Sequence, residues 1–186
     1  MRIIAGTVGG RRIDAPAGAD VRPTTDRVRE ALFSSLGNRV AGASVLDLFA
    51  GSGALGLESL SRGAGHATFV ERGKGTLLIL RRNIASLGMD DRCAVVAGDA
   101  LTFLRNHPPA RFDLIFLDPP YDGTLLADAL GLIAGRDLLA EEGVILAEHR
   151  ESAPLQPPDN LQVIRQRKYG STCITFIGRR AAPSPE

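Results

Sequence analysis

The sequence is poor in the residues that form disulfides, metal sites and aromatic surfaces. It contains no tryptophan, two cysteines, three histidines and only 5% aromatic residues. Cys93 and Cys173 lie far apart and lack metal-ligand spacing, which predicts buried free thiols and no bound metal. His66, His107 and His149 show no partner pattern, so we interpret them as surface or packing residues.

Long hydrophobic runs are also absent. No apolar run approaches the roughly 20 residues that a membrane-spanning helix needs. The N-terminal stretch MRIIAGTVGGRR lacks the apolar core of a signal peptide. We therefore expect a cytoplasmic protein without a membrane partner, and we expect it to be a monomer.

Charge is nearly balanced but unevenly distributed. The 186 residues are 44% hydrophobic and 23% charged with a net charge of +1, which is typical of one globular domain. Residues 1–40 contain seven arginines against four acids, whereas residues 101–150 contain eight acids against four arginines. A basic patch built from the termini could meet phosphate. An ordinary solvated face is the alternative, and charge alone slightly favours it.

From Ser44 onward, short apolar runs alternate with helical patterns. We expect strands at 44–49, 66–70, 93–97, 112–117 and 143–149, and helices at 54–62, 76–87, 101–106 and 124–133. Strands separated by helices at this interval indicate right-handed βαβ units. They predict an α/β fold whose parallel sheet carries helices on both faces.

The two ends of the chain depart from this alternation. Two β-like runs, 161–168 and 171–177, are separated only by Tyr169-Gly170, which predicts an antiparallel hairpin at a sheet edge. Residues 2–16 resemble a small glycine-turned β element. A helix then opens in RPTTDRVREALFSSL, with Thr24 or Thr25 as its cap and with Val28, Leu32 and Leu36 as its inner stripe. We divide the chain into a small β element (1–22), a main domain (23–180) and a frayed tail (181–186).

A glycine-rich loop follows the first expected strand. Gly51, Gly53 and Gly56 match the spacing of a dinucleotide-binding fingerprint, and Glu71 ends the next strand 20 residues after Gly51. An acid at that place can bind ribose hydroxyls. The pattern predicts binding of a nucleotide-type cofactor, with a purely structural tight turn as the alternative.

Two aspartates bear on which cofactor this is. Asp47 lies four residues before Gly51, where its carboxylate would repel a pyrophosphate bound at the helix N-terminus. S-adenosylmethionine has no phosphate and carries a sulfonium and an ammonium, so it fits an acid better; a carboxylate bonded only to loop amides is the alternative. Asp99 ends the third expected strand, where it can meet the adenine amine or cap the helix that starts at Ala100.

The fourth expected strand ends in FLDPPY. In an open parallel sheet this strand lies beside the first, which places Asp118 next to the glycine loop. Pro119 and Pro120 have no N–H and fix the backbone, so that the Asp118 carboxylate and the Pro119 carbonyl form two rigid acceptors for one amine. Tyr121 can stack on the base that carries the amine. The stretch predicts methyl transfer to an exocyclic nitrogen, and a proline-rich turn with a capping aspartate is the alternative.

These motifs resemble a known family. DLFAGSGALGLESLSRGA and FLDPPY are similar to the class I S-adenosylmethionine-dependent amino-methyltransferases. RIIAG…GRRI…RPTTDRVREALFSSL resembles more narrowly the RsmD family of bacterial 16S rRNA guanine-N2 methyltransferases. The likeness runs from about Arg2 to the C-terminal hairpin. It implies a Rossmann-like fold with a mostly parallel seven-stranded sheet, and a target guanine in 16S rRNA within an assembled or partly assembled small ribosomal subunit.

The resemblance also implies roles for individual residues. The target amine would be held by Asp118, Pro119, Pro120 and Tyr121. S-adenosylmethionine would be bound by Asp47, Phe49, Ala50, Gly51, Ser52, Gly53, Gly56, Glu71, Arg72, Asp99 and Ala100. Candidate phosphate contacts are Arg2, Arg11, Arg12, Arg22 and Arg27, although Arg27 could instead pair with Asp26. With few aromatic residues, RNA recognition should depend on shape and backbone contacts.

Three other functions share some of these features. An adenine-N6 methyltransferase acting on RNA or DNA would contain the same loop and DPPY, although the DNA enzymes usually have a larger recognition insertion. An NAD-dependent oxidoreductase would share GSGALG and Glu71. A non-catalytic RNA-binding module could retain the cofactor fold.

Overall fold

The computed structural model describes residues 1–16, 23–120, 124–152, 155–170 and 172–180. Its α-helices are α1 (Pro23–Leu36), α2 (Ala54–Ser61), α3 (Lys74–Leu87), α4 (Ala100–Asn106) and α5 (Leu125–Gly135), with 3-10 turns η1 (Gly37–Val40) and η2 (Asp90–Arg92). Its strands are β1 (Ser44–Asp47), β2 (His66–Glu71), β3 (Cys93–Ala97), β4 (Phe112–Leu117), β5 (Leu139–Arg150), β6 (Leu161–Tyr169) and β7 (Thr172–Arg179).

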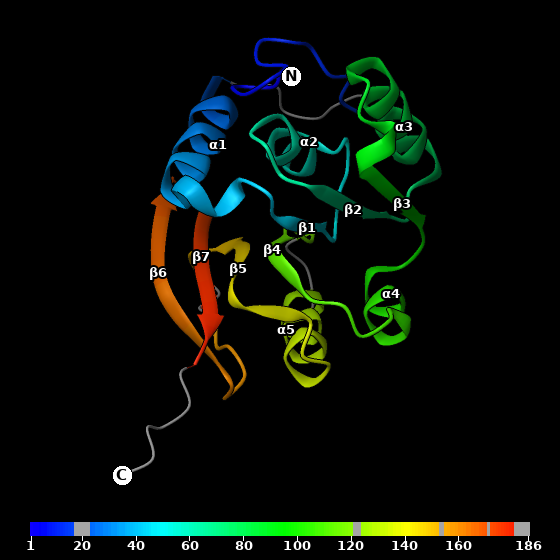
Figure 1. The fold of residues 1–186 in the computed structure, drawn as a ribbon. Coiled ribbons are helices and arrows are strands. Elements are labelled where there is room, and N and C mark those ends of the chain that lie inside the picture. The colour runs from blue at the N-terminus through cyan, green and yellow to red at the C-terminus, as the bar shows by residue number, and fades with distance from the viewer. Residues whose placement is uncertain (17–22, 121–123, 153–154, 171, 181–186) are drawn as a thin grey trace.

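The strands form one seven-stranded sheet in the order β3-β2-β1-β4-β5-β7-β6. The first five run parallel to their neighbours, and β7 lies antiparallel between β5 and β6. The prediction of a mostly parallel sheet with a C-terminal antiparallel hairpin at its edge is confirmed (Figure 1).

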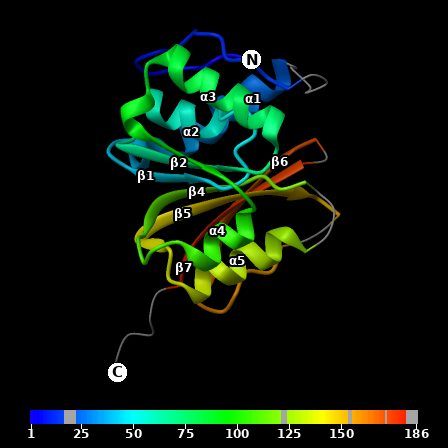
Figure 2. The same ribbon diagram turned by 90° about the vertical axis from the view of Figure 1, so that its right-hand side faces the viewer.

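Helices cover both faces of this sheet, as predicted. Figure 2 shows α1, α2 and α3 on one side and α4 and α5 on the other. Because side chains alternate along a strand, each face has its own apolar core. Neighbouring positions of β4 illustrate this alternation: Phe116 packs in the core under α1–α3, and Leu117 packs in the core under α4 and α5.

The largest boundary difference concerns β5, which begins at Leu139 rather than at the predicted 143. Leu139 pairs with Phe112, and the pairing shifts register between Phe112 and Leu114. The added residues include the exposed Glu141 and Glu142 and then Gly143. Two charged residues followed by glycine do not form a pattern that predicts a strand. These residues are part of β5 because they belong to the strand that pairs with β4.

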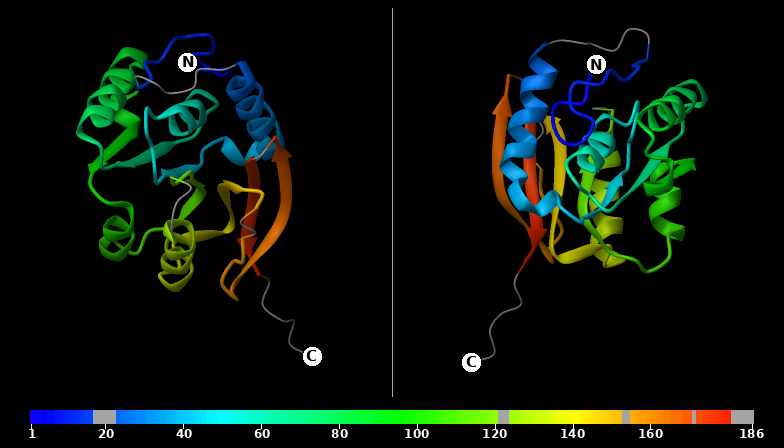
Figure 3. Two further views of the ribbon diagram at one scale, coloured as in Figure 1. Left: turned by 180° about the vertical axis from the view of Figure 1, so that it is seen from behind. Right: turned by 45° about the horizontal axis from the view of Figure 1, so that its top comes forward.

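The N-terminal segment (residues 1–14) packs against the domain. It is a glycine-turned loop closed by a single antiparallel bridge between Arg2 and Arg12. Ile3 and Ile13 are buried in the core under α1–α3. Gly6, with φ +86°, passes so close to α2 that a Cβ would meet the Ser61 carbonyl oxygen at 1.9 Å. Figure 3 shows the segment lying over α2, between α1 and α3.

Both cysteines are free thiols, as predicted. Cys173 is buried, and Cys93 is half-buried, which raises the pKa of its thiol to about 12. Within the described ranges, no helix is both long and apolar enough to cross a membrane.

Candidate functional site

The carboxyl ends of β1, β2, β3 and β4 meet at one edge of the sheet. Asp47 pairs in register with Phe69 of β2 and Phe116 of β4, so the loops that follow these strands start side by side. Between them lies a first cavity of about 230 Å³. Its lining residues are Leu48, Phe49, Val70, Glu71, Arg72, Gly98, Asp99, Ala100, Asp118, Pro120 and Leu125.

The glycine loop between β1 and α2 requires glycine for two separate reasons. Gly53 precedes α2 with φ +87°, a left-handed conformation that side chains disfavour. Gly56 lies in the first turn of α2, where a Cβ would come within 2.3 Å of Cε1 of Phe69. The tight turn and the close helix–strand packing are the roles that a dinucleotide-type fingerprint gives to its glycines.

Asp47 lies beneath this loop rather than on the cavity wall. Its side chain is 3% exposed, and its carboxylate accepts a hydrogen bond from the Gly56 N–H at 3.0 Å. Burial raises the pKa of Asp47 to about 7; the Gly56 hydrogen bond opposes this shift and nearby Glu71 adds to it. This hydrogen bond to a backbone amide corresponds to the alternative left open by the sequence, in which the Asp47 carboxylate binds amides rather than the cofactor. Because Asp47 does not line the cavity, it can influence a ligand there only through its charge.

Glu71 and Asp99 both line the cavity and are already held by backbone amides. Glu71 accepts hydrogen bonds from the Gly51 N–H at 2.9 Å and the Gly73 N–H at 2.6 Å. Asp99 accepts one from the Thr102 N–H at 2.9 Å and so caps α4, which lowers the pKa of its carboxyl. Because a carboxylate has about four acceptor sites, each can still accept from a ligand.

Asp118 follows β4 and borders two cavities. It lines the first cavity and also a second cavity of about 340 Å³ on the other side. The side chain of Asp118 is exposed toward these cavities, yet the dense protein around it desolvates its carboxylate. This desolvation, together with the negative charges of Glu148 and Asp47, raises the pKa of Asp118 to about 7.

The second cavity lies under α1, beside the C-terminal hairpin. Its lining residues are Met1, Val28, Arg29, Leu32, Ala54, Leu55, Asp118, Glu148, Tyr169, Thr172 and Ile174. Among them, only Asp118 was predicted from the sequence as a site residue. Glu148 could have been found by the same argument as Asp118, because it is a polar residue near the carboxyl end of a central strand.

The first cavity brings together five of the eleven predicted cofactor residues. Phe49, Glu71, Arg72, Asp99 and Ala100 line the first cavity, as do Asp118 and Pro120. The predicted residues that do not line it are Asp47, the loop residues Ala50, Gly51, Ser52, Gly53 and Gly56, and the buried Pro119. Leu48, Val70, Gly98 and Leu125 were missed, although the first three adjoin predicted residues. Tyr121 lies outside the described residues.

The predicted RNA-contacting arginines lie near the N-terminal segment. Arg11, Arg12 and Arg27 are exposed, and the side chain of Arg2 is 63% exposed beside Asp26. The Asp26 carboxylate forms ion pairs with Arg2 at 3.2 Å and with Arg29 at 3.0 Å. Arg22 lies outside the described residues, and the role of these arginines in RNA binding stays a prediction.

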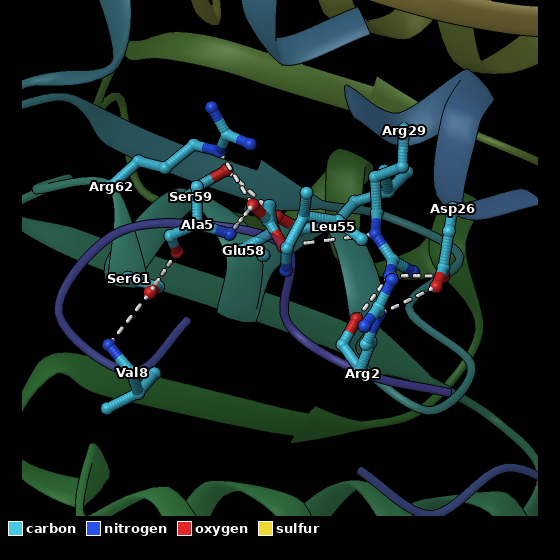
Figure 4. A network of polar contacts seen from close by, with 12 residues as sticks. Arg2, Ala5, Val8, Asp26, Arg29, Leu55, Glu58, Ser59, Ser61 and Arg62 are labelled. Carbon is cyan, nitrogen blue, oxygen red and sulfur yellow. Dashed lines mark hydrogen bonds and ion pairs between the residues drawn. The ribbon is translucent and has the colours of Figure 1, made fainter. Parts of the chain in front are cut away.

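A buried ion network anchors this segment (Figure 4). Glu58 of α2 is fully buried and accepts hydrogen bonds from the N–H groups of Ile4 at 2.7 Å and Ala5 at 3.1 Å, and from Arg62 at 2.6 Å. Arg29 of α1, 5% exposed, approaches Glu58 at 3.9 Å and donates to Asp26 and to the Arg2 carbonyl. The network thereby fixes Arg29 in the wall of the second cavity.

The sequence is similar to a protein family and to bacterial methyltransferases. Residues 1–178 match the family model described as conserved hypothetical protein 95. The chain is 39% identical to YlbH, a candidate rRNA methyltransferase of Bacillus subtilis, over 97% of this chain and 100% of the relative. It is 37% identical to ribosomal RNA small subunit methyltransferase D of Escherichia coli K12, over 97% of this chain and 91% of the relative.

A solved structure shows the same fold. That of yhhF, a candidate methyltransferase of Escherichia coli, superposes with a TM-score of 0.88 at 37% identity and covers 98% of this chain and 99% of its own. These matches confirm the resemblance to the RsmD family that the sequence motifs indicated. The chain belongs to the family described as conserved hypothetical protein 95, and it has the Rossmann-like fold of class I methyltransferases.

Proposed function

We propose that this protein transfers a methyl group from S-adenosylmethionine to the exocyclic N2 amine of a guanine in small-subunit ribosomal RNA. One observation carries the proposal: a single carboxylate, Asp118, borders both cavities. An amine bound to Asp118 from the second cavity faces the first. The names of the Escherichia coli and Bacillus subtilis relatives support ribosomal RNA as the substrate class.

The first cavity has a donor set that suits this cofactor. Glu71, Asp99 and Asp118 line it and Asp47 lies beneath it, so a positively charged ligand is favoured and a pyrophosphate is not. This distribution argues against the NAD-dependent alternative. Remaining acceptor sites on Glu71 can bind ribose hydroxyls, and Leu48, Phe49 and Val70 offer apolar surface for adenine. When bound, S-adenosylmethionine supplies an electrophilic methyl group on a sulfonium.

The protein's own contribution is to orient and activate the amine. The lone pair of a base amine is delocalised into the ring, which makes the nitrogen a poor nucleophile. Asp118 and the Pro119 carbonyl can accept its two hydrogens, which favours a pyramidal nitrogen and stabilises the positive charge that develops there. The new N–C bond would replace the methyl–sulfur bond, with S-adenosylhomocysteine as the leaving group, and the nitrogen would release one proton. A carboxylate whose pKa is about 7 can receive it.

The substrate is assigned as the assembled or partly assembled small subunit, and the enzyme as a monomer. Arg2, Arg11, Arg12 and Arg27, with Arg22, are assigned as phosphate contacts that position the RNA. The target base must leave its stack to reach Asp118, at a cost of a few kcal/mol.

Labelled methyl transfer tests the proposed function. Small subunits from a strain that lacks this activity are incubated with labelled S-adenosylmethionine and either wild-type protein or Asp118→Asn. We expect label in N2-methylguanosine with the wild type and about a 100-fold or greater loss with the variant, in the range of removing one transition-state contact. Label in N6-methyladenosine would instead support the adenine alternative. Binding of NAD without binding of S-adenosylhomocysteine, measured by calorimetry, would refute the proposal.

A further inference from the structure

We infer that the second cavity holds the target guanine and that Glu148 recognises the N1–H of that base. The inference rests on the proposed function and extends it by naming a specificity residue. The cavity of about 340 Å³ lies within the size range of small-molecule sites. Among the lining residues of the two cavities, Asp118 is the one that they share.

The strand register places Glu148 beside Asp118. Leu117 of β4 pairs with Ala147 of β5, so Asp118 and Glu148 each lie one residue further in the same parallel register. Leu117 and Ala147 point into the core under α4 and α5, and the next residue along each strand points to the opposite face. Both carboxylates line the second cavity there. They thus form an adjacent pair rather than two separate acids.

This pair matches the hydrogen-bonding edge of guanine. Guanine presents its N1–H donor directly beside its N2 amine. A carboxylate at Glu148 accepts from N1–H while Asp118 accepts from the amine. Adenine presents an acceptor, N1, beside its N6 amine, and that lone pair would face the Glu148 carboxylate without a proton between them. A site built to receive a donor rejects a base that lacks one, because its buried polar groups are left unpaired.

The other walls of the cavity suit a flat ring. Met1, Val28, Leu32, Leu55 and Ile174 give it apolar surface. The half-buried Tyr169, at the end of β6, adds an aromatic ring on which a base can stack. Arg29 in the same wall is fixed by Asp26 and the Arg2 carbonyl (Figure 4), so the N-terminal segment stabilises one side of the pocket.

Three variants of the full-length protein test this role. Glu148→Ala removes the acceptor, and Glu148→Gln retains the shape but replaces one carboxylate oxygen by a donor. Glu151→Gln is the matched control, because Glu151 is an exposed acid just beyond β5 that pairs with Lys168. Each is assayed on the small subunits described above for kcat, KM and product nucleoside, and by calorimetry for binding of S-adenosylhomocysteine.

We expect kcat/KM to fall about 10- to 100-fold in Glu148→Ala and less in Glu148→Gln, the range for one good base contact. Affinity for S-adenosylhomocysteine should be unchanged, and Glu151→Gln should behave as the wild type. Relaxed selectivity, seen as label in N6-methyladenosine with Glu148→Gln but not with the wild type, would support the assignment further.

The pH profile separates recognition from a merely structural role. The charged and titratable groups around Asp118 are Asp47 beneath the glycine loop, Glu71, Arg72 and Asp99 in the first cavity, and Arg29, Glu148, Tyr169 and Met1 with its N-terminal amine in the second. Of the negative charges, Glu148 raises the Asp118 pKa most. Glu148→Gln should therefore shift the acid limb of the rate profile to lower pH, and Glu151→Gln should not.

Two outcomes would overturn the inference while leaving the proposed function intact. One is wild-type kcat/KM in both Glu148 variants. The other is a parallel loss of S-adenosylhomocysteine affinity, which would assign Glu148 to the cofactor site. Failure of the wild type itself to methylate guanine N2 is a different result and would refute the proposed function.

Discussion

Replacing Asp47 with asparagine should stabilise the fold and weaken binding of the cationic cofactor. The wild-type carboxylate is 3% exposed and accepts a hydrogen bond from the Gly56 N–H. Asparagine is nearly the same size, and its Oδ1 can accept that hydrogen bond. The substitution therefore removes a buried charge and exchanges one carboxylate oxygen for an NH2 group.

The magnitude follows from the raised pKa. The pKa of Asp47 is about 7 in the folded protein against an ordinary value of 3.8, and each pKa unit corresponds to about 1.4 kcal/mol. Between these two values the folded protein retains a proton that the unfolded chain has lost, so stability falls as pH rises from about 4 to about 7. Between pH 5 and pH 8, Asp47 alone should cost the wild type about 3 kcal/mol relative to the variant.

Urea denaturation at several pH values measures this difference. The free-energy advantage of Asp47→Asn should grow between pH 5 and pH 7 and stay constant above that. Asp159→Asn, a change at an exposed aspartate before β6, serves as the control and should show no comparable growth. Parallel stability curves for wild type and Asp47→Asn, or a variant that is less stable at pH 8, would refute the electrostatic argument.

Three further predictions follow from specific contacts. Gly56→Ala should destabilise by about 1–3 kcal/mol in urea denaturation because its Cβ would overlap Phe69, whereas Gly131→Ala in α5, with open space around it, should stabilise slightly. Glu58→Ala should cost about 3–5 kcal/mol because it removes the buried partner of Arg62 and leaves the N–H groups of Ile4 and Ala5 without their acceptor. It should also speed limited proteolysis of the N-terminal segment, and unchanged cleavage would count against this. The ratio of affinities for S-adenosylmethionine and S-adenosylhomocysteine, measured by calorimetry, should rise from pH 6 to pH 8 as the carboxyls of Asp47 and Asp118 ionise, and a flat ratio would contradict it.

The sequence predicted the sheet well, and it singled out, as cofactor residues, five of those that line the first cavity, because both inferences depend on local patterns. Apolar runs and their spacing predicted the seven strands and five α-helices that the structure describes, and the carboxyl ends of parallel strands necessarily meet at one edge. Glu71 at the end of β2 and Asp99 after β3 both line the first cavity, whereas Gly51, Gly53 and Gly56 do not. These inferences need only short segments and a general rule of sheet topology.

The remaining features depend on contacts between distant segments. Glu58 lies in a short helix, where an acid is normally expected to face solvent, yet it is fully buried. Its partners Ile4 and Ala5 lie more than fifty residues earlier in the chain. Likewise, the sequence places Glu148 near the carboxyl end of its strand, but its position beside Asp118 comes from the pairing of β4 with β5. Local sequence patterns do not report such contacts.

The clustering of carboxylates lowers the stability of the unliganded protein and favours ligands that carry positive charge or hydrogen-bond donors. Asp47 and Asp118 both have pKa values near 7, because each is desolvated and lies near another acid. Such a cluster destabilises the unliganded fold above neutral pH. A cation in the first cavity would offset that repulsion, and donor groups on a base in the second cavity would satisfy the same carboxylates from the other side. We therefore expect each ligand to favour the ionised state that the other requires, so that cofactor and target guanine bind with positive coupling through Asp118.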